Sequence, residues 1–73
     1  MGINTMQNIE LAYAKTFSCE SGAMVISHLR KITVERTLGP NATDSELRTL
    51  EGARALVHQI ESLILRGREN AKT

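Results

Sequence analysis

The stretch TDSELRTLEGARALVHQIESLI, residues 43–64, decides the fold. Its apolar residues recur every three or four positions, the spacing that places side chains on one face of an α-helix. They are Leu47, Leu50, Ala53, Val57, Ile60 and Ile64, and the stripe is widened by Leu56 and Leu63. The pattern predicts an amphipathic helix over residues 44–68, roughly 37 Å long at about 1.5 Å per residue.

A capping box marks the start of this helix. The Thr43 hydroxyl can accept a hydrogen bond from the Glu46 amide, and the Glu46 side chain can reach back to the Thr43 amide. Gly67 lies near the predicted C-terminal end of the helix. The basic residues around it, Arg66, Arg68 and Lys72, suit the negative end of a helix dipole. Both helix caps, Thr43 and Glu46, are therefore expected at the first turn.

A second helix is predicted over residues 18–38. Serine is a favoured N-cap residue, so Ser18 is expected to begin it. Gly39, followed by proline, is a strong stop signal. The β-branched run at residues 32–34 lowers helix propensity, so the helix ends either near residue 31 or near residue 38. We favour the longer helix.

The third predicted helix is the shortest and covers residues 5–16. Met6, Ile9, Tyr13 and Phe17 follow helical spacing there, but the segment needs tertiary contacts to be stable. The expected fold is all-α, with a single domain over residues 1–73. A long antiparallel hairpin is formed by residues 18–38 and 44–68, and the N-terminal helix lies across it.

The composition favours association with another protein. A chain of 73 residues buries only about 60–65% of the surface that its unfolded form exposes, so its stability is marginal. One cysteine excludes an intrachain disulfide, and the two histidines, which lie far apart in the sequence, argue against a metal cluster. Only 3% of the residues are aromatic, which predicts an aliphatic core. No secretory signal or membrane span is recognisable, and we expect synthesis in a cytoplasm.

Enzymatic chemistry is not expected from the titratable residues. Cys19 would lie in the first helical turn, where thiols can be activated. His28 lies nine residues further along the same helix, roughly 13 Å away, so only His58 could act as its base. No third orienting group, phosphate loop or metal-ligand spacing accompanies them. We predict no enzyme and no cofactor, with a thiol-dependent activity as a remote alternative.

DNA binding is the stronger alternative, because small helical domains often contain a helix-turn-helix motif. The exposed face of the last helix offers Arg48, Arg54 and Gln59 for contacts with DNA. The negative charges of Glu51 and Glu61 on the same helix offset the positive charges of the arginines. The net charge is only +1, so the chain lacks a basic face for phosphates. Nucleic acid is therefore not the favoured partner.

A strip of small and polar residues on the last helix is the main interface candidate. A glycine inside a helix costs about 0.5–1 kcal/mol relative to alanine, so Gly52 calls for a packing reason. A small-residue strip lets a second backbone approach closely, either within the chain or from another protein. The strip comprises Gly52, Ala55, Gln59 and Ser62, and the further candidates for contact with a partner are Leu65, Phe17 and Gly22.

Two clusters resemble a known family. The first is FSCESGAMVISHL, with Phe17, Ser18, Gly22, Val25 and Leu29, and the second is LEGARALVHQIESLI, with Glu51, Gly52, Arg54 and Ile60. Over about residues 14–66 the chain resembles small helical proteins from the structural-gene modules of tailed bacteriophages and prophages, including one of the Bordetella tropism-switching podovirus. Relatives often carry Thr-Pro where this chain has Cys19-Glu20, a change that a first helical turn tolerates.

The resemblance implies a virion protein or an assembly protein. Such a protein would be made in the cytoplasm of the bacterial host and would pack against other virion proteins, around the portal, the neck or the internal proteins. It would form a homo-oligomer or associate with a larger ring. The resemblance implies no catalytic residues.

Overall fold

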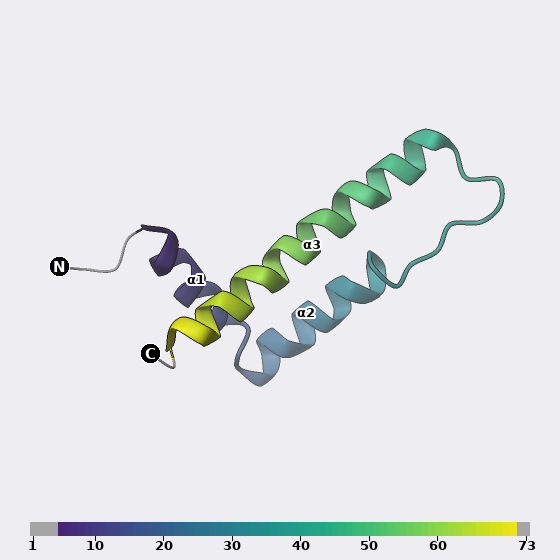
Figure 1. Ribbon diagram of the computed structural model, residues 1–73. Coiled ribbons are helices and arrows are strands. Elements are labelled where there is room, and N and C mark those ends of the chain that lie inside the picture. Colours follow the sequence, from purple (N-terminus) through teal and green to yellow (C-terminus); the bar gives the residue numbers. More distant parts are fainter. Residues whose placement is uncertain (1–4, 72–73) are drawn as a thin grey trace.

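The computed structural model describes residues 5–71, which form three helices and no strand (Figure 1). Helix α1 spans Thr5–Thr16, α2 spans Glu20–Ile32 and α3 spans Asp44–Ala71. The predicted all-α fold with three helices is confirmed. Helix α2 runs antiparallel to α3, and α1 crosses only the C-terminal half of α3, drawn in yellow-green (Figure 1).

The start of α3 follows the predicted cap. The Glu46 amide donates to the Thr43 hydroxyl at 3.1 Å, and this hydroxyl donates to the Glu46 carboxylate at 3.2 Å. The Glu46 side chain therefore meets the hydroxyl in place of the Thr43 amide. Asp44 and Glu46 both lie in the first turn, where the helix dipole favours negative charge.

The start of α2 corrects one prediction, because Cys19 and not Ser18 is the N-cap. Cys19 has extended backbone angles (φ −81°, ψ 165°), and its Sγ accepts from the Gly22 amide at 3.4 Å. The Ser18 hydroxyl instead donates to the carbonyl of Ala14. Ser18 thus satisfies an unpaired carbonyl at the end of α1, which leaves the next residue to cap α2.

The end of α2 corrects a second prediction, since the helix stops at Ile32 and does not reach residue 38. Thr33 leaves the helical region (φ −128°, ψ −76°), and its hydroxyl donates to the Leu29 carbonyl at 2.6 Å. Such a bond back to the preceding turn competes with continued helix. The β-branched run therefore acts as the stop, well before Gly39, and the connection to α3 covers residues 33–43.

Helix α1 packs closely on α3 at Gly67. A Cβ atom at this position would lie 2.1 Å from the Glu10 carbonyl oxygen and 2.6 Å from the Ala14 Cβ. Glu10 and Ala14 are both buried, and the Glu10 carboxylate accepts from the Asn70 side-chain amide at 2.8 Å. Gly67 is therefore an interior residue of α3 that admits α1, and it does not end the helix as the sequence indicated.

Polar contacts join α2 and the chain beyond it to α3. Arg30 donates to the Glu61 carboxylate at 2.7 Å. Arg54 holds the chain beyond α2, because its Nε donates to the Thr33 carbonyl at 3.0 Å and its Nη2 donates to the Arg36 carbonyl. The antiparallel hairpin exists, but its two helices make few backbone contacts compared with α1 and α3.

Replacing Arg54 by alanine should loosen the connection after α2. Two carbonyls would lose a charged donor, and the partly exposed position reduces the cost to about 1–2 kcal/mol of unfolding free energy. Arg54→Lys is the matched control, since one ammonium cannot serve both carbonyls in the fork geometry and should restore only part of the loss. Amide hydrogen exchange over residues 33–38 should accelerate first. Unchanged exchange there would contradict this role.

The helices form a single layer around a small core. The buried apolar side chains in residues 5–71 are Ala14, Leu50, Val57 and Ile64, and no large side chain there is completely buried. The molecule measures 54 × 25 × 13 Å, and its radius of gyration is 15.2 Å. A compact domain of this length would have a radius of about 11 Å. Stable domains usually consist of two or three packed layers that cover each other's apolar faces. Because this chain forms only one layer, both faces of that layer are exposed to solvent.

Candidate protein-interaction surfaces

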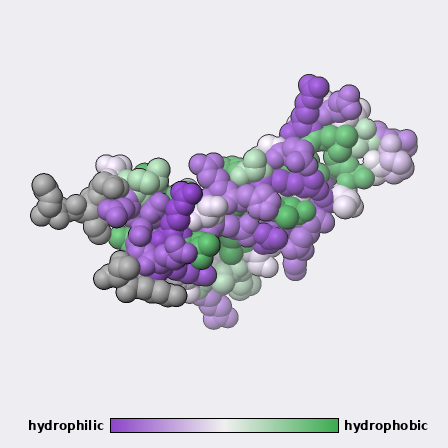
Figure 2. Space-filling view, in the orientation of Figure 1, coloured by the Kyte–Doolittle hydropathy of each residue, from purple (hydrophilic) through white to green (hydrophobic). Residues whose placement is uncertain are grey.

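Large apolar side chains remain exposed on all three helices. Hydrophobic surface interrupts the hydrophilic surface along the molecule, including the end where α3 begins (Figure 2). In the described residues these exposed side chains are Met6, Ile9, Met24, Val25, Ile32, Leu47, Leu56 and Leu65. Single exposed apolar residues are ordinary, but so many beside so small a core are typical of a chain that packs against another protein.

The predicted strip on α3 lies open to solvent. Gly52, Ala55, Gln59 and Ser62 are all exposed, and a Cβ at Gly52 would have no neighbour within 4 Å. Leu65 beside the strip is 57% exposed. No helix within residues 5–71 packs on the strip, so close approach between these helices does not explain Gly52. Contact with another protein remains the prediction for these residues.

Phe17 and Gly22 serve contacts within the chain. The Phe17 ring stacks on Tyr13 with 6.3 Å between the ring centroids. Gly22 is buried, and a Cβ there would lie 2.1 Å from the Thr16 carbonyl oxygen and 2.7 Å from the Phe17 Cα. The absence of a side chain at Gly22 therefore lets the turn between α1 and α2 lie close to α2. Contact of Phe17 and Gly22 with a partner stays a prediction.

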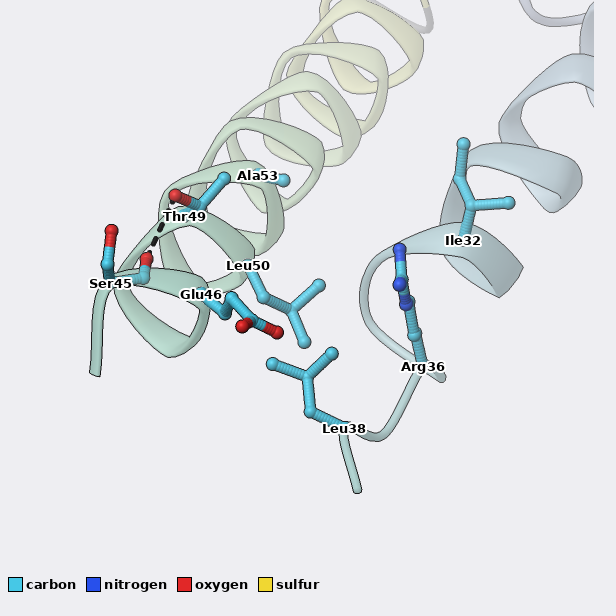
Figure 3. A pocket seen from close by; sticks show the side chains of 8 residues that line it. All are labelled: Ile32, Arg36, Leu38, Ser45, Glu46, Thr49, Leu50 and Ala53. Atoms are coloured by element: carbon cyan, nitrogen blue, oxygen red, sulfur yellow. Dashed lines mark hydrogen bonds between the residues drawn. The ribbon is translucent and has the colours of Figure 1, made fainter. Parts of the chain in front are cut away.

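A groove between the end of α2 and the start of α3 was not expected from the sequence. It encloses about 310 Å³, and Figure 3 shows Leu38 and Leu50 pointing toward one another across it. Its lining residues are Ile32, Arg36, Leu38, Ser45, Glu46, Thr49, Leu50 and Ala53. The groove exists because α2 stops at Ile32. The β-branched run was the signal that could have predicted it, had the shorter helix been preferred.

The candidate chemical residues make ordinary local contacts. Cys19 is exposed, and its thiol donates to the Thr16 carbonyl at 3.5 Å while capping α2. The His58 Nδ1 lies 3.6 Å from the Glu61 carboxylate. Within residues 5–71, no group of three histidine, cysteine or acidic side chains could hold a metal ion. In the same residues, no helix is both long and apolar enough to cross a membrane.

The arginines weighed for DNA binding are not both free. Arg54 is occupied by the Thr33 and Arg36 carbonyls and by the Glu51 carboxylate at 2.6 Å. A side chain held by three protein groups is poorly placed to contact phosphates. Only Arg48 then remains of the two arginines that sequence analysis offered for a recognition face, and a single arginine carries little phosphate affinity.

These features define a class of protein: a small helical protein whose distinguishing surfaces are uncharged helix faces. Its sequence matches the family of Bbp19-like phage proteins over residues 13–70, so the chain belongs to this family. The resemblance to a phage family is thereby confirmed, and it extends through all of α2 and nearly all of α3. No curated protein and no solved structure gives a significant match.

Proposed function

We propose that this phage protein is a structural or assembly component of the virion that acts by packing its helix faces against other virion proteins. The single observation that carries the proposal is the open layer of helices. It has no fully buried large side chain in residues 5–71, while Leu56 and Leu65 on the outside of α3 are more than half exposed. Family membership supports the phage setting.

Burial of helix faces is the proposed mechanism, and it involves no cofactor and no catalysis. The buried stripe of α3 holds the monomer together, whereas the strip with Gly52 and Leu65 lies free for a second protein. At about 25 cal/mol per Å², covering such a surface adds stability that the monomer lacks. The chain would be made in the host cytoplasm and then incorporated into the particle, as a homo-oligomer or on a larger ring.

Quantitative mass spectrometry of purified particles tests this function. We expect the protein in particles at a fixed ratio to the capsid protein. Ala55→Glu should reduce incorporation at least about tenfold while circular dichroism stays unchanged, because the carboxylate would be buried in the contact without a partner. Ala23→Glu, on an exposed position of α2 outside the strip, is the matched control and should be incorporated normally. A protein abundant in infected cells but absent from particles would refute a virion role.

A further inference from the structure

One face of α3 is covered over half of its length only. Residues 7, 11 and 18 positions apart on a helix point in nearly the same direction, since a turn takes about 3.6 residues. Counting back from Gly67, this face includes Ile60, Leu56 and Thr49. Helix α1 lies on the Gly67 end (Figure 1). At the other end, Leu56 is 58% exposed and Thr49 borders the open groove of Figure 3.

The uncovered half of this face has the character of a helix-binding surface. No charged residue lies on the face between Thr49 and Gly67, where it presents Thr49, Gly52, Ala53, Leu56, Ile60 and Leu63. The distance from Thr49 to Ile60 is roughly 16 Å along the helix axis. Its occupant should therefore be an uncharged helix of about three turns.

Helix α1 is a segment with these properties. It has 12 residues, which corresponds to roughly 18 Å. Met6 and Ile9 are 54% and 41% exposed, and the only charged residue before Lys15 is Glu10, which is buried against α3. Before Lys15, the exposed surface of α1 is thus uncharged and presents two large apolar side chains, and it lies at the opposite end of α3 from the vacant half of the face.

We propose that a second copy of this chain covers the vacant half, in an antiparallel dimer with twofold symmetry. Because α1 and the vacant half occupy opposite ends of one face, a twofold rotation places each α1 over the other chain's vacant half. Both contacts form at once, and the assembly closes. The axis passes near residue 58, between Leu56 and Ile60 on this face. A parallel pair would set α1 beside α1 and leave both vacant halves uncovered.

The surface area of the monomer is consistent with a stable dimer. The chain exposes 5625 Å², whereas a compact monomer of 8.1 kDa would expose roughly 4,500 Å². The excess of about 1,100 Å² exceeds the roughly 800 Å² that each partner buries in a standard interface. A second copy can therefore cover a normal interface and still leave the strip with Ala55 and Ser62 for other proteins.

This inference rests on the proposed packing role and names the partner of one surface. Sedimentation and light scattering of the purified chain should give twice the monomer mass across micromolar concentrations. Leu56→Glu should raise the dissociation constant at least about a hundredfold, because two symmetry-related carboxylates would be buried unpaired. Leu65→Glu is the matched control, since Leu65 is equally exposed on another face of α3 and should remain dimeric. A monomeric wild type, or dissociation by Leu65→Glu alone, would overturn the dimer.

Cross-linking tests the antiparallel arrangement. In a Cys19→Ser background, a Met6→Cys chain mixed with an Ala53→Cys chain should form the mixed disulfide. Within one chain, Ala53 lies 14 residues from the Gly67 crossing, roughly 21 Å away, so the contact is intermolecular. A Met6→Cys homodimer in place of the mixed product would indicate a parallel pair. A monomer found in particles would refute the dimer alone, whereas a dimer absent from particles would refute the virion role alone.

Discussion

Replacing Gly67 by alanine is expected to destabilise the fold by about 2–3 kcal/mol. The added Cβ would lie 2.1 Å from the Glu10 carbonyl oxygen and 2.6 Å from the Ala14 Cβ. The first of these is a backbone atom, so α1 as a whole must move away from α3. Movement of α1 would also expose the buried Glu10 carboxylate and break its hydrogen bond from Asn70. For a domain of this size, such a loss is a large part of the total stability.

Gly52→Ala in the same helix is the matched control, and its effect should have the opposite sign. No other part of the same chain comes within 4 Å of a Cβ at Gly52, so within the monomer only helix propensity changes. Alanine should therefore stabilise the fold by about 0.5–1 kcal/mol. Urea unfolding followed by circular dichroism measures both, at one protein concentration because association adds to apparent stability. Destabilisation of equal size by both substitutions would contradict the packing described for Gly67.

The contrast between the two glycines shows where sequence analysis succeeds. The period of apolar residues predicted α3, and its capping box predicted its first turn, because both depend on neighbours within a few residues. Gly52 and Gly67 look alike at this range. Only the crossing of α1, separated from Gly67 by more than fifty residues, distinguishes a glycine that admits another helix from one that lies open. That crossing could not be predicted from local pattern.

The two ends of α2 were missed for a related reason. Ser18 and Cys19 can both cap a helix. The end of α1 decides between them, because the Ser18 hydroxyl donates to the Ala14 carbonyl and Cys19 then caps α2. At the other end, Thr33 bonds back to Leu29 and Arg54 of α3 holds the carbonyls that follow. The groove in Figure 3 results from this early stop. A pattern within one segment contains none of these contacts between segments.

Gly22→Ala should produce the second large effect, at the turn between α1 and α2. All three atoms closest to the added Cβ belong to the backbone of this turn, with the Thr16 carbonyl oxygen at 2.1 Å. The turn cannot yield by rotating a side chain, so it must open, at a cost of about 2–3 kcal/mol. Tyr13 is the only tyrosine and the chain has no tryptophan, so near-ultraviolet circular dichroism reports directly on the Tyr13–Phe17 pair.

Cys19→Ser is the control for this turn, because it keeps the cap and leaves the space at Gly22 unchanged. The weak bond from the Gly22 amide to Sγ would be replaced by one to a hydroxyl, and serine is among the best N-cap residues. We expect Gly22→Ala to lose the Tyr13 signal at a lower urea concentration than the wild type, and Cys19→Ser to retain the wild-type midpoint or exceed it. If Cys19→Ser instead unfolded as readily as Gly22→Ala, the thiol itself would hold the turn. Equal stability of all three chains would mean that the turn accommodates a Cβ, and the close approach of Gly22 to Thr16 would not be what joins α1 to α2.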